Sequence, residues 1–179
     1  GVGTYANVAA GIRFAADNGA KVINLSLGGS APSQTLLDAV AYAHGKGVTV
    51  VAAAGNDGLN SISYPAAYDA YVIAVGATRF DETRTSYSNY GASLDLVAPG
   101  GDLTVDQNGD GYGDGVLQNT FNPNTKSRSD FGYWFFQGTS MAAPHVAGVA
   151  ALMIAKGNAT LPADVRKALE STAKDLGAT

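Results

Sequence analysis

The chain has 179 residues, of which 46% are apolar and 15% charged, with a formal charge of −4 and 23 glycines. These values indicate one globular domain with a sizeable core, and they argue against a disordered chain or a basic surface for nucleic acid. No apolar run approaches the ~20 residues that cross a bilayer, and the lack of cysteine excludes a disulfide scaffold. We also expect no signal peptide, because no charged leader precedes an apolar run at the start.

Hydrophobic periodicity predicts that strands alternate with helices along the chain. The first helix is expected over residues 4–18, and Ser33 is a suitable cap for a second helix over 34–46. Short apolar runs of the kind found in buried parallel strands occur at 22–27, 48–54, 71–77 and 93–97, and a last helix is expected at 162–172. This order predicts a three-layer α/β fold, with a mostly parallel sheet and helices on both faces.

A long helix is predicted from about Ser140 to Lys156. Thr139 or Ser140 is a good N-cap type, and Pro144 falls in or just after the first turn, where its missing N–H costs little. The helix is apolar all round, which predicts that it is buried. The start of this helix would stabilise negative charge beside the hydroxyl of Thr139 or Ser140, because unpaired N–H groups and the positive end of the helix dipole lie there. An ordinary cap on a core helix is the alternative.

Three segments are predicted to meet at one edge of the sheet. Gly28-Gly29 and Gly55-Asn56 each follow a predicted strand, and an aromatic run leads into Ser140 at the start of the long helix. Ligands of parallel sheets bind at the carboxyl ends of the strands. We therefore expect these segments to converge on one cleft.

The same segments carry a family resemblance. The string from Gly138 to Gly148, Gly-Thr-Ser-Met-Ala-Ala-Pro-His-Val-Ala-Gly, resembles the nucleophile segment of the subtilisin-like serine proteases, or subtilases. Val22 to Gly29 resembles that family's substrate-binding strand, and Val50 to Gly58 resembles its oxyanion-hole turn. The resemblance covers nearly the whole chain apart from an inserted stretch near 101–132. It implies a secreted, extracellular serine endopeptidase, with this chain as the C-terminal part of the subtilisin-like catalytic domain and an N-terminal part missing.

The resemblance also implies roles for individual residues. Ser140 would be the nucleophile, with its own N–H and the Asn56 side-chain amide as oxyanion donors, as acyl transfer requires. A plain turn residue is the alternative for Asn56. A protein or peptide substrate would contact Ser26, Leu27 and Gly28 on one wall of the cleft and Ala53, Ala54 and Gly55 on the other. The preferred substrate side chain is left open.

Neither of the two histidines is expected to act as the general base for Ser140. His145 lies five residues after Ser140 on the same helix, ~140° round the axis and ~7.5 Å along it, so it cannot take the Ser140 proton directly. We interpret His44, near a helix C-terminus, as a partly exposed residue favoured by the dipole. The Asp-Thr-Gly or Asp-Ser-Gly and His-Gly-Thr settings of the family's catalytic Asp and His do not occur.

We therefore expect the isolated chain to be almost inactive and to need a segment that carries those two residues. Exposed sheet edges would otherwise let it self-associate. The alternative is a non-catalytic calcium-binding fragment or binding module that retains the fold. No membrane or nucleic-acid partner is expected.

The inserted stretch contains a predicted calcium loop. Its spacing matches the first nine positions of an EF-hand-type loop, and the ligands would be Asp106, Asn108, Asp110, the carbonyl of Tyr112 and Asp114. Position 12 is Leu117 rather than Glu, so Asp102 or another carboxylate would have to complete the shell. A solvated Gly/Asp hairpin is the alternative. A weaker cation site at the carbonyls of Ala66 and Tyr68 is implied by the resemblance alone.

Overall fold

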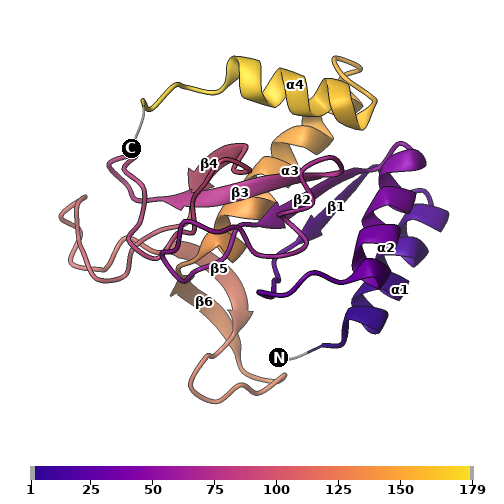
Figure 1. Ribbon diagram of the computed structural model, residues 1–179. Coiled ribbons are helices and arrows are strands. Elements are labelled where there is room, and N and C mark those ends of the chain that lie inside the picture. Colours follow the sequence, from indigo (N-terminus) through magenta and orange to yellow (C-terminus); the bar gives the residue numbers. More distant parts are fainter. Residues whose placement is uncertain (1–2, 178–179) are drawn as a thin grey trace.

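A parallel sheet forms the centre of the molecule (Figure 1), and the computed structural model describes residues 3–177. The strand order is β1-β2-β3-β4, and the strands cover Val22–Leu25, Thr49–Ala53, Val72–Thr78 and Leu96–Pro99. Every residue of β2 and β3 is buried, as expected for strands covered on both faces. The predicted parallel sheet is confirmed, although β4 begins at Leu96 rather than at residue 93.

Helices cover both faces of this sheet and define two hydrophobic cores (Figure 1). One face is covered by α1 and α2 and the other by α3 and α4, which span Tyr5–Asp17, Gln34–Gly45, Thr139–Ala155 and Pro162–Thr172. The predicted cap of α2 is confirmed, because the Ser33 side chain accepts a hydrogen bond from the Leu36 N–H. In the described part of the chain, no helix is both long enough and apolar enough to cross a membrane.

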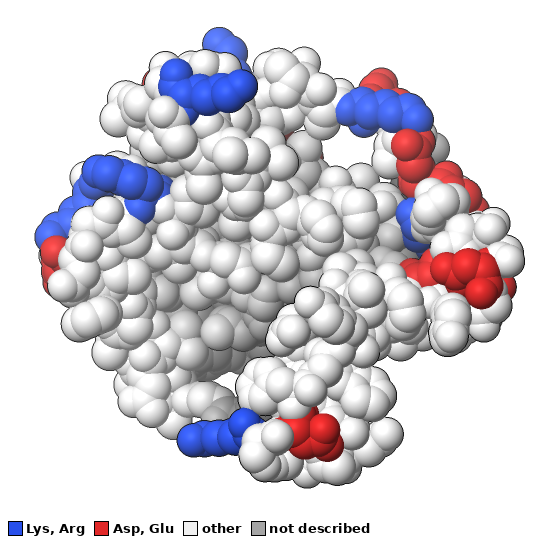
Figure 2. Space-filling view, turned by 180° about the vertical axis from the view of Figure 1, so that it is seen from behind, with Lys and Arg blue, Asp and Glu red and all other residues white. Residues whose placement is uncertain are grey.

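Helix α3 corrects two predictions. Gly138, and neither Thr139 nor Ser140, is its N-cap, and no side chain caps the helix. The helix is also not buried all round, since Val149 and Leu152 are 48% and 65% exposed. An all-apolar sequence cannot indicate which faces are covered. On the side of the molecule that carries α3, charged side chains lie around the rim and the middle is uncharged (Figure 2).

The stretch at 101–132, expected as an inserted calcium loop, also contains a strand that the sequence pattern does not predict. β5 (Val116–Phe121) pairs antiparallel with β6 (Phe131–Phe136), and Asn119 lies opposite Tyr133. Both strands alternate between half-buried and exposed residues, so neither is a core strand. β6 leads directly into Gly138 and α3, and the hairpin therefore flanks Ser140.

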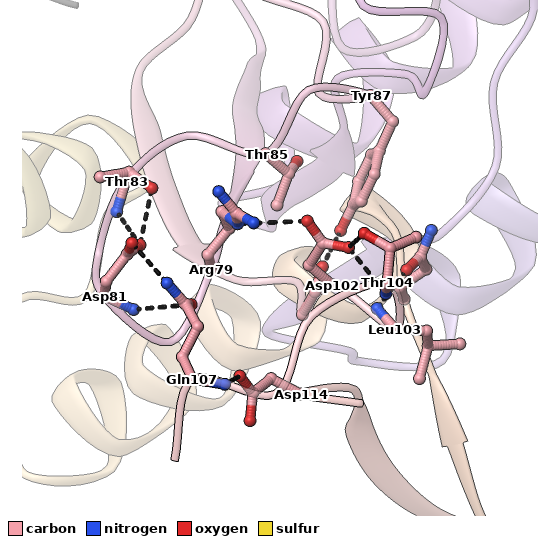
Figure 3. Close-up of polar contacts among 12 residues, drawn as sticks. Arg79, Asp81, Thr83, Thr85, Tyr87, Asp102, Leu103, Thr104, Gln107 and Asp114 are labelled. Atoms are coloured by element: carbon pink, nitrogen blue, oxygen red, sulfur yellow. Dashed lines mark hydrogen bonds and ion pairs between the residues drawn. The ribbon is translucent and has the colours of Figure 1, made fainter. Parts of the chain in front are cut away.

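The loop before β5 is anchored to the turn after β3 (Figure 3). Arg79 Nε lies 3.1 Å from Asp102 Oδ2 in an ion pair whose carboxylate side chain is 9% exposed. Burial tends to raise the pKa of Asp102, but hydrogen bonds from the Thr104 hydroxyl and N–H and the charge of Arg79 together lower this pKa below its usual value. The ionised carboxylate therefore belongs to the folded structure.

Candidate active site

The carboxyl end of β1 is joined directly to the start of α3. The Ser26 hydroxyl donates a hydrogen bond to the carbonyl oxygen of Ser140 at 2.7 Å. It accepts one from Asn24 Nδ2 at 2.9 Å. The first turn of α3 is thus fixed to the sheet edge at which parallel sheets bind ligands.

The turn after β2 is joined to the same helix through Asn56. Asn56 Oδ1 accepts hydrogen bonds from the Thr139 N–H at 2.8 Å and from the Thr139 hydroxyl at 3.0 Å. The hydroxyl oxygen in turn accepts from the Gly55 N–H at 3.2 Å. Thr139 is fully buried, so the amide oxygen of Asn56 is held against α3. Its Nδ2 group has no acceptor among the described residues, and neither has the Ser140 N–H.

Gly138 leaves the space that these two donors share. A Cβ atom on Gly138 would lie 3.7 Å from Asn56 Nδ2, 3.7 Å from the Ser140 nitrogen and 3.5 Å from Asn56 Oδ1, which is already bonded to Thr139. The residue has a φ of 141°, a conformation that a side chain would strain. Two unpaired N–H donors therefore flank one small space next to Ser140, an arrangement suited to a developing oxyanion.

A hollow of about 460 Å³ opens beside Ser140 and is lined by Ser26, Val116, Gln118, Ser140, Met141, Pro144 and His145. Val116 and Gln118 belong to β5, so the missed hairpin forms one side of the site. His145 Nδ1 lies 2.8 Å from the Met141 carbonyl oxygen, which holds the ring on its own helix. A larger hollow of about 930 Å³ runs along β4, away from Ser140.

The residues predicted to bind substrate divide into two groups. Residues 26–28 are exposed, and within the described chain their backbone groups make no hydrogen bond to other backbone groups. Ala53 and Ala54 are instead buried, and the Ala54 N–H and carbonyl are already bonded to Val75 and Ser63. These two alanines could form only the floor of a pocket, and their contact with substrate stays a prediction.

In the predicted calcium loop, the side-chain oxygens accept hydrogen bonds from N–H groups of the loop itself. The Asp106 carboxylate accepts hydrogen bonds from three N–H groups, those of Gly109, Asp110 and Gly111. The side-chain oxygens of Asn108 and Asp110 accept from N–H groups two residues further on, those of Asp110 and Tyr112.

Asp114 closes the loop differently (Figure 3). Its Oδ2 accepts from the Gln107 N–H, whereas its Oδ1 is buried with no partner. Within residues 3–177, no three acidic or His side chains form a cluster that could hold a metal ion.

A three-layer parallel α/β fold with Gly-Thr-Ser at the start of a core helix is the architecture of the subtilisin-like serine proteases. The chain belongs to the Subtilase family, whose model matches residues 1–179. It is 44% identical to Subtilisin Savinase from Lederbergia lenta over 100% of this chain and 58% of that protein. It is also 44% identical to an alkaline protease from Alkalihalobacillus alcalophilus, over 100% of this chain and 41% of that protein.

Solved structures give the same result for the fold. Proteases from Pseudoalteromonas arctica match with a TM-score of 0.85 and 38% identity, over 99% of this chain and 54% of theirs. A cold adapted subtilisin-like serine proteinase matches with a TM-score of 0.79 and 33% identity, over 98% of this chain and 57% of its own. The predicted family and fold are confirmed, and the chain spans about half the length of these relatives.

Proposed function

We propose that this chain carries the nucleophile and the oxyanion site of a serine endopeptidase. The Ser140 hydroxyl oxygen would attack the carbonyl carbon of a peptide bond, and its proton would pass through a base to the leaving amine. The negative oxygen would bind between Asn56 Nδ2 and the Ser140 N–H. The observation that supports this most strongly is that these two donors have no other partner and flank the same space at Gly138.

We infer that the base comes from outside these 179 residues. The chain has two histidines. His145 is bonded to its own helix, and His44 packs edge-on against Tyr71, with ring centroids 5.6 Å apart, at the C-terminal end of α2. Neither donates to or accepts from Ser140. Members of a catalytic triad act as a unit, so Ser140 without its base should be a poor nucleophile.

Two surfaces are suited to the segment that supplies the base. Among the described strands, β1 pairs only with β2 and leaves its other edge free. Helix α3 also has exposed apolar residues, Val149 and Leu152. Without such a segment these surfaces would recruit a second copy of the chain. Light scattering of the isolated chain should then show dimers or larger species, and a clean monomer would contradict this.

The substrate would be an extended polypeptide. The free backbone groups of residues 26–28 can pair with an extended chain, as in recognition by strand addition. This supports a protein or peptide substrate without defining its side chains. We propose an extracellular location together with this activity, on the basis of the family resemblance.

Calcium is the ion that we propose for loop 106–114. The loop offers carboxylate and carbonyl oxygens at alternate positions, which suit a hard cation. The buried, unpartnered Oδ1 of Asp114 is the observation that favours a cation, because such an oxygen is costly without a partner. The ion would stabilise the loop and would take no part in catalysis.

A fusion protein tests the main proposal. A segment of Subtilisin Savinase that carries that family's Asp and His motifs is joined to this chain, and hydrolysis of a chromogenic peptide is measured. We expect activity in the fusion, none in the isolated chain, and none in the fusion with Ser140→Ala. A folded but inactive fusion would favour the alternative, a non-catalytic calcium-binding module. Activity that survives Ser140→Ala would exclude Ser140 as the nucleophile.

A further inference from the structure

Asn89 lies inside the turn that carries Asn56, although it belongs to the segment between β3 and β4. It is only 2% exposed. Its Oδ1 accepts hydrogen bonds from the Asp57 N–H at 2.9 Å and the Leu59 N–H at 3.1 Å. Its Nδ2 donates to the Ala54 carbonyl at 3.3 Å. The side chain thus bonds to the backbone on both sides of Asn56.

An amide side chain makes this set of bonds without any change of protonation state. It offers an acceptor to two N–H groups and a donor to a carbonyl from the same short side chain. Aspartate would place an oxygen against the Ala54 carbonyl, and alanine would leave all three backbone groups without this partner.

Gly55 makes room for the amide. A Cβ atom at this position would lie 2.3 Å from Asn89 Nδ2, and the backbone has a φ of 111°. The Gly55 carbonyl also accepts from the Asn89 N–H at 3.0 Å. Gly55 and Asn89 therefore fit each other as a pair, and the turn is built around this one buried side chain.

We propose that Asn89 is a positioning residue for the oxyanion donor of Asn56. Thr139 holds the Asn56 amide through its oxygen, and Asn89 holds the backbone from which that amide projects. The catalytic part of this inference depends on the proposed function of Asn56, whereas the ordering of the turn does not. A small misplacement of a catalytic group can reduce the rate by roughly 10²-fold.

The first test measures the order of the Asn56 side chain in the isolated chain. The Asn56 Nδ2 amide resonances are followed by NMR in the parent chain, in Asn89→Ala and in Asn60→Ala, an exposed asparagine near the same turn that serves as control. In the parent and in Asn60→Ala, we expect these resonances to be sharp and shifted from those of a freely rotating asparagine side chain. In Asn89→Ala we expect them to lie at the averaged positions of a mobile side chain. An Asn56 amide that stays ordered in a folded Asn89→Ala chain would overturn the proposal, whether or not the protein is a protease.

The second test measures kcat in the fusion described above, per active site titrated with a fluorophosphonate. We expect Asn89→Ala to lower kcat roughly 10- to 100-fold with little change in KM. It should cause no further loss in an Asn56→Ala background, because the donor that it positions is then absent. An equal loss in both backgrounds, or none in either, would overturn the catalytic role.

The two tests also separate failure of this inference from failure of the proposed function. An inactive parent fusion with a disordered Asn56 amide in Asn89→Ala would contradict the protease proposal and leave the positioning intact. Should Asn89→Ala not fold, Asn89→Asp keeps an acceptor for the Asp57 and Leu59 N–H groups and replaces the donor to the Ala54 carbonyl by an oxygen. Asn89→Asp should also reduce the order of the Asn56 amide and lower kcat, with a smaller loss of kcat than Asn89→Ala. An Asn56 amide and a kcat that both stay unchanged would overturn the proposal.

Discussion

The Asn56 side-chain oxygen is bonded twice to Thr139, once by its N–H at 2.8 Å and once by its hydroxyl at 3.0 Å. The residue just before the proposed nucleophile therefore orients the proposed oxyanion donor. The sequence pattern alone indicates no more than a helix cap for Thr139. Its hydroxyl instead bridges Asn56 and Gly55, which ties the turn after β2 to the start of α3.

Removal of this hydroxyl should impair catalysis more than binding. In the active fusion, Thr139→Val keeps the shape of the side chain and loses both the hydrogen bond to Asn56 and the acceptor of the Gly55 N–H. We therefore expect kcat to fall about 10-fold, equivalent to about 1.4 kcal/mol. Asn56→Ala should lose more, roughly 10²–10³-fold, which is the loss known for removal of such a donor from subtilisin itself. Thr139→Ser is the control and should retain nearly full kcat. A Thr139→Val enzyme with unchanged kcat would show that Asn56 needs no such orientation.

The ion pair between Arg166 of α4 and Asp95 should be essential for stability. The Asp95 side chain is 8% exposed and also accepts from the Ala74 N–H, so loss of the arginine would leave a buried carboxylate without its counter-charge. We expect Arg166→Ala to lower the free energy of unfolding by roughly 3 kcal/mol in urea titrations. Lys167→Ala, at the next and exposed position of the same helix, should change it by less than about 0.5 kcal/mol. Equal effects of the two substitutions would contradict this assignment.

Acid should weaken the contact between Arg79 and Asp102. Because the pKa of Asp102 is lowered in the folded state, the pair stabilises the fold fully above the usual value of 3.8 and loses this effect as the pH falls through the lower folded value. The free energy of unfolding of Asp102→Asn should therefore change less between pH 5 and pH 2 than that of the parent, in denaturant titrations run at each pH. Asp38→Asn, at an exposed position, should behave like the parent. The same acid dependence in parent and Asp102→Asn would refute this role.

Calcium should raise the thermal stability of the chain. At a calcium concentration about 100-fold above Kd, binding would add about 2.7 kcal/mol and raise Tm by roughly 5–10 °C. Calorimetry should show binding heat for the parent and for Asp130→Ala, a half-buried acid beyond the loop, but not for Asp110→Ala. No heat and no change in Tm for the parent would identify the loop as a plain Gly/Asp hairpin.

Periodicity and composition predicted the core of the fold better than its margins. Buried strands such as β2 and β3 are continuous apolar runs, and their order with the helices leaves few other architectures. The β5–β6 hairpin escaped prediction because the polarity of β5 does not follow its burial, since Leu117 and Phe121 lie on its exposed face, and because a polar loop separates the two strands. The burial of α3 was predicted incorrectly because every face of that helix is apolar.

The site was predictable where a residue carries its own chemistry, and not where it supports another residue. Ser140 and Asn56 stand in segments whose glycines and strand ends indicate a ligand site. Asn89 gave no such signal, because its partners are backbone groups of a distant segment that only the fold brings together.

The rate at which a fluorophosphonate labels Ser140 shows whether this serine is a nucleophile that depends on a base from another segment. It is measured by intact mass for the isolated chain, for the fusion with the Asp- and His-bearing segment, and for that fusion with Ser140→Ala. We expect rapid single labelling of the fusion, very slow labelling of the isolated chain, and none after Ser140→Ala. Equally rapid labelling of the isolated chain, or labelling that survives Ser140→Ala, would contradict this expectation.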